Sequence, residues 1–396
     1  MKKTLLLSVV ASTMIMAGGD IAPVEPVEAA PAASAWEFSG NAVGYYQTVG
    51  DDTLDIFDTE NSFGNTGAQL RATNADLVAG IGAGIEVTGL AELPFVADNY
   101  AQSPVGELNH AGGWISQAYL TYGFGNTSIK VGRQELPKAL SPFAFSENWN
   151  VFKNTFDAAL LVNTDITDTA IVYAFVDSAN FNMSFGSSPM NQFNDLNQDD
   201  GVHMLTVQNK SIADLTLTGS FYHGTEHIGG EDTQILWGDA AYNAGNFGVA
   251  IQGGTVMNDS LVDDITSFGA KIDGAVSGIN LMAAYSTVEE GAMFQLGGMT
   301  SALYTTMVGN QLFNGAFEIN ADKFVVGAGI DALGGNISAA YGMADSDITG
   351  DANEFDLVYA TNLTDSVDLS AAYVNYDQDW ATDSWDIVRV IANYKF

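Results

Sequence analysis

Short segments of alternating apolar and polar residues follow one another from residue 36 to the end of the chain. In one of them Leu215, Leu217 and Phe221 alternate with Thr216 and Thr218. Successive side chains of a β-strand point to opposite faces, so a period of two predicts strands with one apolar and one polar face. A β-sandwich would give the same local pattern, so alternation alone does not place the sheet in a membrane.

The links between these segments alternate between short and long. Short links fall near 74–76, 125–126, 166–168, 211–213, 244–246, 275–278, 333–336 and 364–366. Long polar links fall at 49–65, 89–112, 137–154, 178–201, 223–232, 257–264, 288–322, 345–353 and 377–383, and the seventh includes the strand-like segment 313–319. Eight short and nine long links join 18 strands, with every long link on one side. Bacterial outer-membrane barrels have this asymmetry. We therefore predict an all-β fold, a transmembrane antiparallel β-barrel of about 18 strands over 36–396.

The N-terminal residues have the pattern of an export signal. Two lysines, Lys2 and Lys3, precede a mostly apolar stretch that ends at Met16 and is followed by small residues. That stretch is shorter than the roughly 20 residues of a spanning helix, so we predict a cleaved signal peptide at 1–17. Residues 18–35 are rich in Ala and Pro and are predicted to form a periplasmic linker, within which 33–35 offers a second cleavage site.

The C-terminal segment adds an independent argument. Val388, Val390, Tyr394 and Phe396 share one face, whereas Arg389 lies on the other. An apolar face that ends in a terminal phenylalanine resembles the C-terminal signature of outer-membrane barrels. That resemblance implies that Tyr394 and Phe396 serve barrel assembly and that the barrel-assembly machinery is a partner.

Charge and cysteine content exclude several classes of function. The chain has 12 basic and 48 acidic residues, a formal net charge of −36, and no cysteine. Such a field excludes an ordinary basic nucleic-acid-binding surface, and the lack of cysteine excludes disulfides and thiolate metal sites. The sequence also lacks a convincing nucleophile and base pair, so we expect no enzymatic activity and no required cofactor.

A barrel of about 18 strands has a lumen too wide for its own side chains to fill. The third long link, 137–154, is unusually rich in Pro and aromatic residues, and we predict that it folds inward and narrows the lumen. Basic side chains facing carboxylates would set a transverse field across this constriction. An alternative reading is that these residues make scattered salt bridges at the rim. The predicted constriction residues are Arg71, Lys130, Arg133, Lys138, Glu147, Lys153, Asp157 and Arg389.

The segment 127–137, followed by the aromatic link and the run from Asn154 to Asp157, resembles bacterial outer-membrane porins. The signal, the acidic Pro/Ala linker and the Tyr-Lys-Phe end are most similar to the major outer-membrane porins of epsilonproteobacteria. The resemblance implies a homotrimeric channel for small hydrophilic solutes, with Arg133 near the constriction. Strict alternation with Ile129 and Val131 would instead point Arg133 outward, unless a bulge turns it.

One acidic link partly fits a calcium-binding loop. Its candidate ligands are Asp345, Asp347, Thr349, Asp351 and Asp356. Asp stands where Glu is usual, and the surroundings are strands rather than helices, so a solvated acidic loop is the alternative. Divalent ions there could also bridge the protein to the phosphates of outer-membrane lipids and lipopolysaccharide.

Together these patterns predict a porin in the cell outer membrane that passively conducts ions and small hydrophilic solutes. The acidic mouth predicts a preference for cations. The alternative is a secreted, acidic surface-layer or adhesive β-protein without a pore, which would leave the terminal phenylalanine and the alternating link lengths unexplained.

Overall fold

The computed structural model describes residues 35–51, 55–93, 112–147, 152–180, 191–197, 200–293, 295–298, 300–308, 319–379 and 384–396. The predicted signal peptide and all but the last residue of the predicted linker lie outside these ranges, as does segment 313–318. The described residues form one short 3₁₀ helix, η1 (Thr59–Asn61), and 19 strands. The strands are β1 (Glu37–Gly50), β2 (Ser62–Val78), β3 (Ile81–Glu92), β4 (Gly112–Phe124), β5 (Thr127–Gln134), β6 (Thr155–Asn163), β7 (Thr169–Asn180), β8 (Asn194–Asp195), β9 (Val202–Asn209), β10 (Leu215–Ile228), β11 (Glu231–Asn243), β12 (Phe247–Asn258), β13 (Ile265–Val276), β14 (Ile279–Glu289), β15 (Ala321–Ala332), β16 (Gly335–Ser346), β17 (Gly350–Thr364), β18 (Val367–Gln378) and β19 (Trp385–Lys395).

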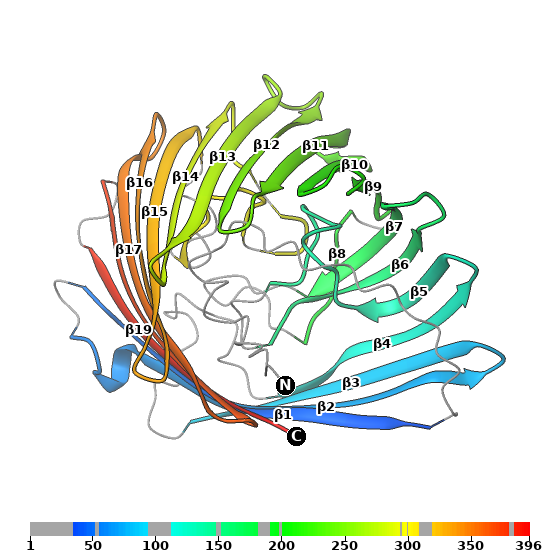
Figure 1. The fold of residues 1–396 in the computed structure, drawn as a ribbon, viewed down its shortest axis with the longest axis horizontal. Helices are drawn as coiled ribbons and strands as arrows, with labels where there is room; N and C mark the ends of the chain where they lie inside the picture. The colour runs from blue at the N-terminus through cyan, green and yellow to red at the C-terminus, as the bar shows by residue number, and fades with distance from the viewer. Residues whose placement is uncertain are drawn as a thin grey trace.

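The strands close into an antiparallel ring (Figure 1). Each strand pairs with the next along the chain, and β19 returns to pair with β1 from Lys395 opposite Asn41 to Asp386 opposite Gly50. β8 is an exception, because it pairs only with the end of β7. The remaining 18 strands confirm the predicted barrel and its strand number. Because a closed ring has no edge strands, each of these 18 strands has a partner on both sides.

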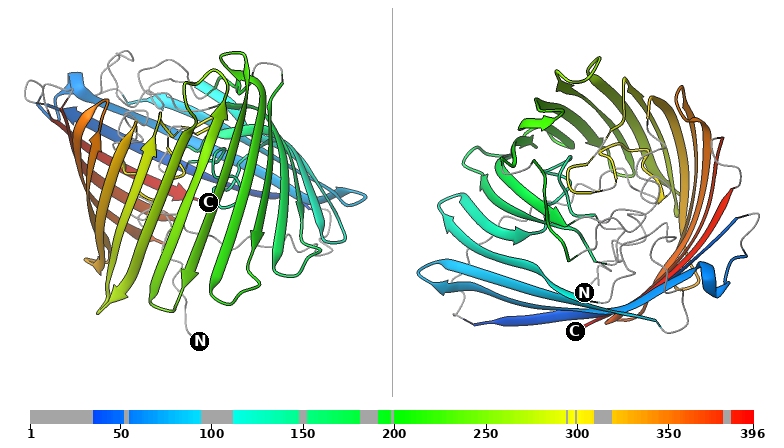
Figure 2. Two further views of the ribbon diagram at one scale, coloured as in Figure 1. Left: turned by 90° about the horizontal axis from the view of Figure 1, so that it is seen from above. Right: turned by 180° about the vertical axis from the view of Figure 1, so that it is seen from behind.

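The tight turns gather at one end of the barrel, and Figure 2 shows those of the green and yellow strands along its lower edge. Three predicted links differ from the structure, and one of them, the long link expected at 345–353, is only 347–349. The turn expected near 74–76 lies at Ala79 and Gly80, because β2 continues to Val78. The long link expected at 223–232 is a two-residue turn at Gly229 and Gly230, because β10 and β11 extend through the polar residues on either side. Both glycines there have positive φ, which the turn requires.

The two faces of the wall differ in chemistry. Large apolar side chains such as Leu70, Leu120 and Ile251 are exposed on the outer face. Polar side chains such as Thr206 and Gln252 face inward and are buried. An apolar outer face with a polar inner face is the arrangement of a transmembrane barrel, because lipid surrounds it and water enters it.

Four tyrosines of the outer face point their hydroxyls toward the strand ends opposite the tight turns. Their hydroxyls hydrogen-bond to polar side chains on neighbouring strands. The pairs are Tyr173 with His203 (2.8 Å), Tyr285 with Asp322 (2.7 Å), Tyr341 with Asn353 (3.0 Å) and Tyr373 with Asp386 (2.6 Å). We call these four residues the tyrosine belt, since aromatic rings with a polar tip favour the boundary between membrane and water. Among the described residues, no helix is long and apolar enough to cross a membrane.

The C-terminal residue lies at the seam where the ring closes. The backbone of Phe396 exchanges two hydrogen bonds with Gly40, at 2.9 and 3.0 Å. A side chain at position 40 would collide with the Phe396 ring, so glycine makes this approach possible. The ring of Phe396 lies 5.8 Å from that of Tyr394, and both side chains are exposed on the outer face.

Candidate pore constriction

Two segments fold into the ring and lie against its inner wall (Figures 1 and 2). The first inward loop is the β5–β6 connection, described at 135–147 and 152–154. The second inward loop is the β14–β15 connection, described at 291–293, 295–298 and 300–308. Leu136 and Phe143 of the first loop and Leu303 of the second are almost completely buried, in one apolar cluster with the inner wall. Burial of these side chains against the wall stabilises the inward position of both loops.

Phe143 is the main aromatic contact between the first inward loop and the wall. Its ring meets Tyr222 of β10 and Trp237 of β11 edge to face, at centroid distances of 5.6 and 5.1 Å. Its backbone N–H donates to the Tyr222 hydroxyl at 3.1 Å. Edge-to-face aromatic pairs stabilise a contact beyond the free energy gained by burying apolar area. The contact of Phe143 with these two rings therefore holds the loop at one place on the inner wall.

The second inward loop crosses the inner wall from β12 to β17. The Gln252 amide of β12, in the orientation that satisfies both groups, donates to Ala302 and accepts from the backbone of Tyr304. Lys271 of β13 lies 5.4 Å from the centre of the Tyr304 ring. At the far end, the Val308 N–H donates to a carboxylate oxygen of Asp356, at 3.4 Å. The polar groups of the wall thus hold the loop along much of its described length.

Hydrogen bonds also join the two inward loops to each other. The donors and acceptors are Leu296 N to Phe143 O (2.6 Å), Asn154 Nδ2 to Gly297 O (2.6 Å), Thr300 N to Glu147 Oε1 (2.7 Å) and Lys138 Nζ to Ser301 O (3.1 Å). Lys138 and Glu147, both predicted as constriction residues, therefore connect the loops. Glu147 is buried in this contact.

Ionisable side chains form a charged strip inside the barrel, over β2–β5 and the adjoining ends of the first inward loop. The strip consists of Arg71, Glu86, Lys130, Glu135 and Lys153. Arg71 is 2.6 Å from the carboxylate of Glu86 and 3.6 Å from that of Glu135. Lys153 reaches the other oxygen of Glu135 at 2.7 Å. The side chains of Arg71 and Lys153 are each 41% exposed, so the strip meets water while carrying one more positive than negative charge.

Lys130 and Arg389 make contacts with aromatic rings. The Lys130 ammonium lies 3.8 Å from the centre of the Tyr119 ring, a cation–π distance. Arg389 of β19 is buried, donates through Nε to Gln47 at 3.0 Å and lies 5.6 Å from the Tyr45 ring. Both basic residues are on the inner face of the wall.

Arg133 and Asp157 lie on the opposite face from the charged strip. Arg133 is on the same side of β5 as Val131, which is 49% exposed on the outer wall, and it directly opposes Asp157 on β6. Two hydrogen bonds of 2.9 and 2.8 Å join their side chains, and the Phe193 ring stacks on the guanidinium. The expectation that these two residues line the constriction therefore differs from the structure. The β6–β7 bulge lies beyond Asp157 and the described β5 pairings are regular, so strict alternation holds at Arg133.

The residues of the expected calcium loop do not come together. The link between β16 and β17 is only 347–349, and Asp345 and Asp351 oppose each other on the two strands beside it. Asp356 lies farther along β17, buried on the inner wall. In the described parts of the chain no three His, Cys, Asp or Glu side chains are placed to hold a metal ion. The acidic hairpin thus has part of the sequence pattern of a calcium loop without its geometry.

Sequence reasoning missed the second inward loop and the two glutamates of the charged strip. The signal for the loop was available, because Met293, Leu296, Leu303 and Met307 are as apolar as the residues that pointed to 137–154. Glu86 had no such signal. It becomes notable only through its position, where Gln69 and Ser116 as well as Arg71 donate to its carboxylate.

The chain matches no protein-family model and no curated protein. Solved structures do share its fold. OpdK of Pseudomonas aeruginosa, solved with vanillate, aligns with a TM-score of 0.72 at 12% identity, over 91% of this chain and 98% of that one. OccK3 (OpdO) of the same organism aligns with a TM-score of 0.69 at 14% identity, over 91% and 95%. A second structure of OpdK, described there as an outer membrane protein of Pseudomonas aeruginosa, aligns with a TM-score of 0.69 at 12% identity, over 91% of this chain and 99% of that one. The chain therefore has the barrel fold of these proteins over nearly its whole length.

Proposed function

We propose that this protein is an outer-membrane porin, a passive channel for ions and small hydrophilic solutes. The observation that carries the proposal is a closed ring with an apolar outer face and a polar inner face that exposes charged side chains to water. A secreted surface-layer or adhesive protein would not need an apolar outer face around a closed ring. The fold shared with the outer membrane protein OpdK also supports the channel over that alternative.

The path for solutes, in this proposal, narrows between the charged strip and the two inward loops. Arg71, Lys130 and Lys153 would meet the solute directly, since they belong to the strip. Lys138 and Glu147 would act by holding the loops together, and Arg389 by shaping the inner wall at Gln47 and Tyr45. In this proposal the inward loops and the inner wall set the width of the narrow region, and the charged strip sets its charge.

Ion preference follows from two regions of opposite charge. The acid excess of the chain, −36 overall, favours cations at the mouth. The charged strip carries an excess of positive charge and would reduce that preference, so small organic anions could also pass. OpdK was solved with vanillate, whose carboxylate is a group that arginine and lysine side chains bind.

Export and assembly complete the proposal. Residues 1–17 would be removed as a signal peptide, and 18–35 would remain as a periplasmic linker. The exposed rings of Tyr394 and Phe396 would be presented to the barrel-assembly machinery. The mature protein would form a homotrimer in contact with outer-membrane lipids and lipopolysaccharide, as in the epsilonproteobacterial major porins that the sequence resembles.

Planar-bilayer recording tests the channel function. Purified, detergent-folded protein added to one side of the bilayer should raise the current in discrete steps, each step being one insertion event. Protein unfolded by boiling should give none. Absence of steps from protein that migrates as a folded barrel on an unheated gel would contradict the proposal and favour the surface-layer alternative.

A further inference from the structure

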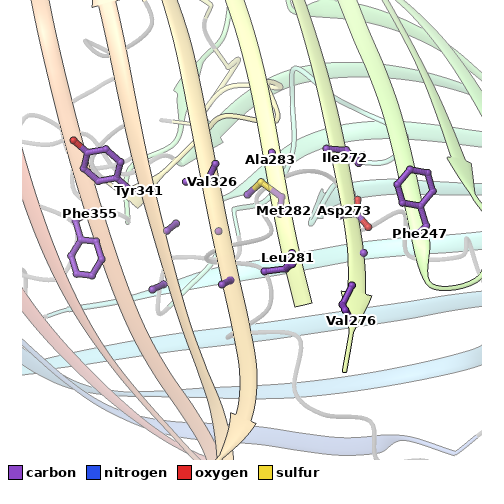
Figure 3. A pocket seen from close by; sticks show the side chains of 15 residues that line it. Phe247, Ile272, Asp273, Val276, Leu281, Met282, Ala283, Val326, Tyr341 and Phe355 are labelled. Atoms are coloured by element: carbon purple, nitrogen blue, oxygen red, sulfur yellow. The ribbon is translucent and has the colours of Figure 1, made fainter. Parts of the chain in front are cut away.

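Two acidic side chains of β17 lie on the inner wall, at the far end of the second inward loop. Glu354 and Asp356 are two positions apart on the strand, and each is 0% exposed. Phe355 between them points to the outer side, beside Tyr341 of β16 (Figure 3). Strand alternation therefore turns both carboxyl groups to the inner face. We call Glu354 and Asp356 the carboxyl pair.

The contact within the carboxyl pair needs a proton. The two carboxyl groups are hydrogen-bonded to each other. An ionised carboxylate has acceptor oxygens only, so this bond requires that one of the two groups is protonated. Asp356 Oδ1 is buried and accepts no hydrogen bond from an N–H or O–H group of the described residues. A proton shared with Glu354 would give this oxygen a partner.

The charges around the carboxyl pair also favour one proton. Lys323 of β15 is 1% exposed, and its ammonium interacts electrostatically with Asp356. Among the described residues, the other ionisable side chain that faces the pair is Tyr376 of β18, directly opposite Glu354. Two carboxylates and one ammonium would leave a net charge of −1, and burial of an unbalanced charge is costly. One proton on the pair makes the cluster neutral.

The second inward loop is attached to the wall at this pair. The Val308 N–H donates to Asp356 Oδ2 at 3.4 Å. The side chain of Met307 fills the space above Gly342, the β16 residue directly opposite Glu354. Both loop residues are buried. The loop therefore lies over the carboxyl pair, and Asp356 in turn holds the loop.

We propose that Glu354 and Asp356 share one proton at neutral pH, and that the protonated pair holds the second inward loop against the wall. The inference rests on the proposed function, in which this loop narrows the channel, and it adds the bound proton as a regulator of the loop. With the proton present, one carboxyl group donates to the other while Asp356 Oδ2 accepts from Val308. Loss of the proton to water leaves two carboxylates in contact, which repel each other. The loop is then held less firmly.

Infrared spectroscopy detects the proton directly. A protonated carboxyl group has a C=O stretch that is separate from the bands of carboxylates and backbone amides. In purified full-length protein at neutral pH, Glu354→Gln and Asp356→Asn should each lower this band by the intensity of one carboxyl group, since no second carboxyl group remains to share the proton. The matched variant Asp351→Asn, at an exposed position of the same strand, should leave the band unchanged. No loss from either pair variant would overturn the proposal.

Hydrogen exchange tests the attachment of the loop. Asp356→Val removes the acceptor of the Val308 N–H, so amide exchange in 300–308 should become several-fold faster. Asp356→Asn and Glu354→Gln should keep the slow exchange, because a side-chain amide can donate to the remaining carboxylate as the protonated group did. Each variant is first shown to migrate as a folded barrel on an unheated gel. Unchanged exchange in folded Asp356→Val would overturn the proposal.

The unmodified protein offers a second test of the same link. When the pH is raised until the carboxyl band disappears, the protection of 300–308 should fall, after correction for the intrinsic pH dependence of exchange. Glu354→Gln has no shared proton to lose and should keep its protection over the same pH range. Loss of the band without a change in protection would overturn the proposal.

Neither spectroscopy nor exchange requires a conducting channel, so this inference and the proposed function fail separately. Protein that gives no current steps would contradict the channel, while the band and the exchange rates would still decide whether the pair holds a proton and the loop. In a conducting channel, Asp356→Val should show more open-channel noise than Asp356→Asn. Equal noise would overturn the role of the protonated pair in holding the channel at one width.

Discussion

The salt bridge between Lys153 and Glu135 permits a test with two changes of opposite sign. Lys153→Gln removes one positive charge from the charged strip, and Glu135→Gln removes one negative charge from the same contact. We expect the first variant to become more cation-selective and the second to become less so. Both side chains are partly exposed, at 41% and 31%, so neither change leaves a deeply buried charge unpaired.

The size of the effect follows from Coulomb's law. Two unit charges about 4 Å apart in bulk water interact by about 1 kcal/mol, and the energy halves at about 8 Å. Since about 1.4 kcal/mol corresponds to a tenfold ratio, the permeability of each ion should change by about twofold to fivefold. Cation and anion permeabilities change in opposite directions, so their ratio should change by about fivefold to about 25-fold. The two variants should shift it by similar factors in opposite directions, and the double variant should return it close to the original value.

Reversal potentials in a potassium chloride gradient measure this ratio. The recordings should be made near 0.1 M salt, where the Debye length is about 10 Å, and repeated near 1 M, where it is about 3 Å. The shifts should shrink at high salt because they arise from charge. Shifts in the same direction for both variants, or no shift in either, would refute the location of the charged strip in the ion path.

Three further predictions concern the loops and the barrel seam. Phe143→Ala should increase open-channel noise, because replacing a buried phenylalanine by alanine costs about 3–5 kcal/mol of stability and so loosens the first inward loop. Equal noise from Phe268→Ala, a variant of an exposed residue on the outer wall, would contradict this. Deleting Phe396 removes both backbone hydrogen bonds to Gly40, so less heat-modifiable, folded protein should reach the outer membrane, and an unchanged amount would argue against a role in closure. Burial, followed by the charge of a nearby aspartate, raises the pKa of the Tyr304 phenol. Once the pH rises above about 10, where an unfolded tyrosine ionises, the second inward loop should lose stability and the current should become noisier. The variant Tyr304→Phe should lack this pH dependence.

The fold could be predicted because two signals with separate physical causes agree. Alternation reports which face of each strand meets lipid, and link length reports which end of the barrel a connection occupies. The errors fall where polar residues belong to a strand rather than a link. The segment 223–232 is polar, yet β10 and β11 extend through it to the two glycines of the turn, with a register shift between Gly224 and Ile228.

The candidate site was less accessible to sequence reasoning, because a ring brings together strands that are distant in the chain. Arg71 and Lys153 are 82 positions apart, yet Glu135 contacts both. Arg133 was predicted to line the constriction partly because it lies near Lys130 in the chain. Its side chain lies on the other face of the same strand. For that residue alternation was the better guide. The second inward loop was missed because its apolar residues were counted as part of a long polar link.

Accessibility of adjacent residues to a water-soluble reagent tests the central claim, that the wall turns one face to lipid and the next to a water-filled lumen. The chain contains no cysteine, so single cysteines can be placed at Gln69, which faces the charged strip, and at Leu70, which is exposed on the outer wall. In membranes, a charged thiol reagent should modify Gln69→Cys and lower its conductance, while Leu70→Cys should remain unmodified. Equal modification of both, or modification of Leu70→Cys alone, would contradict the account.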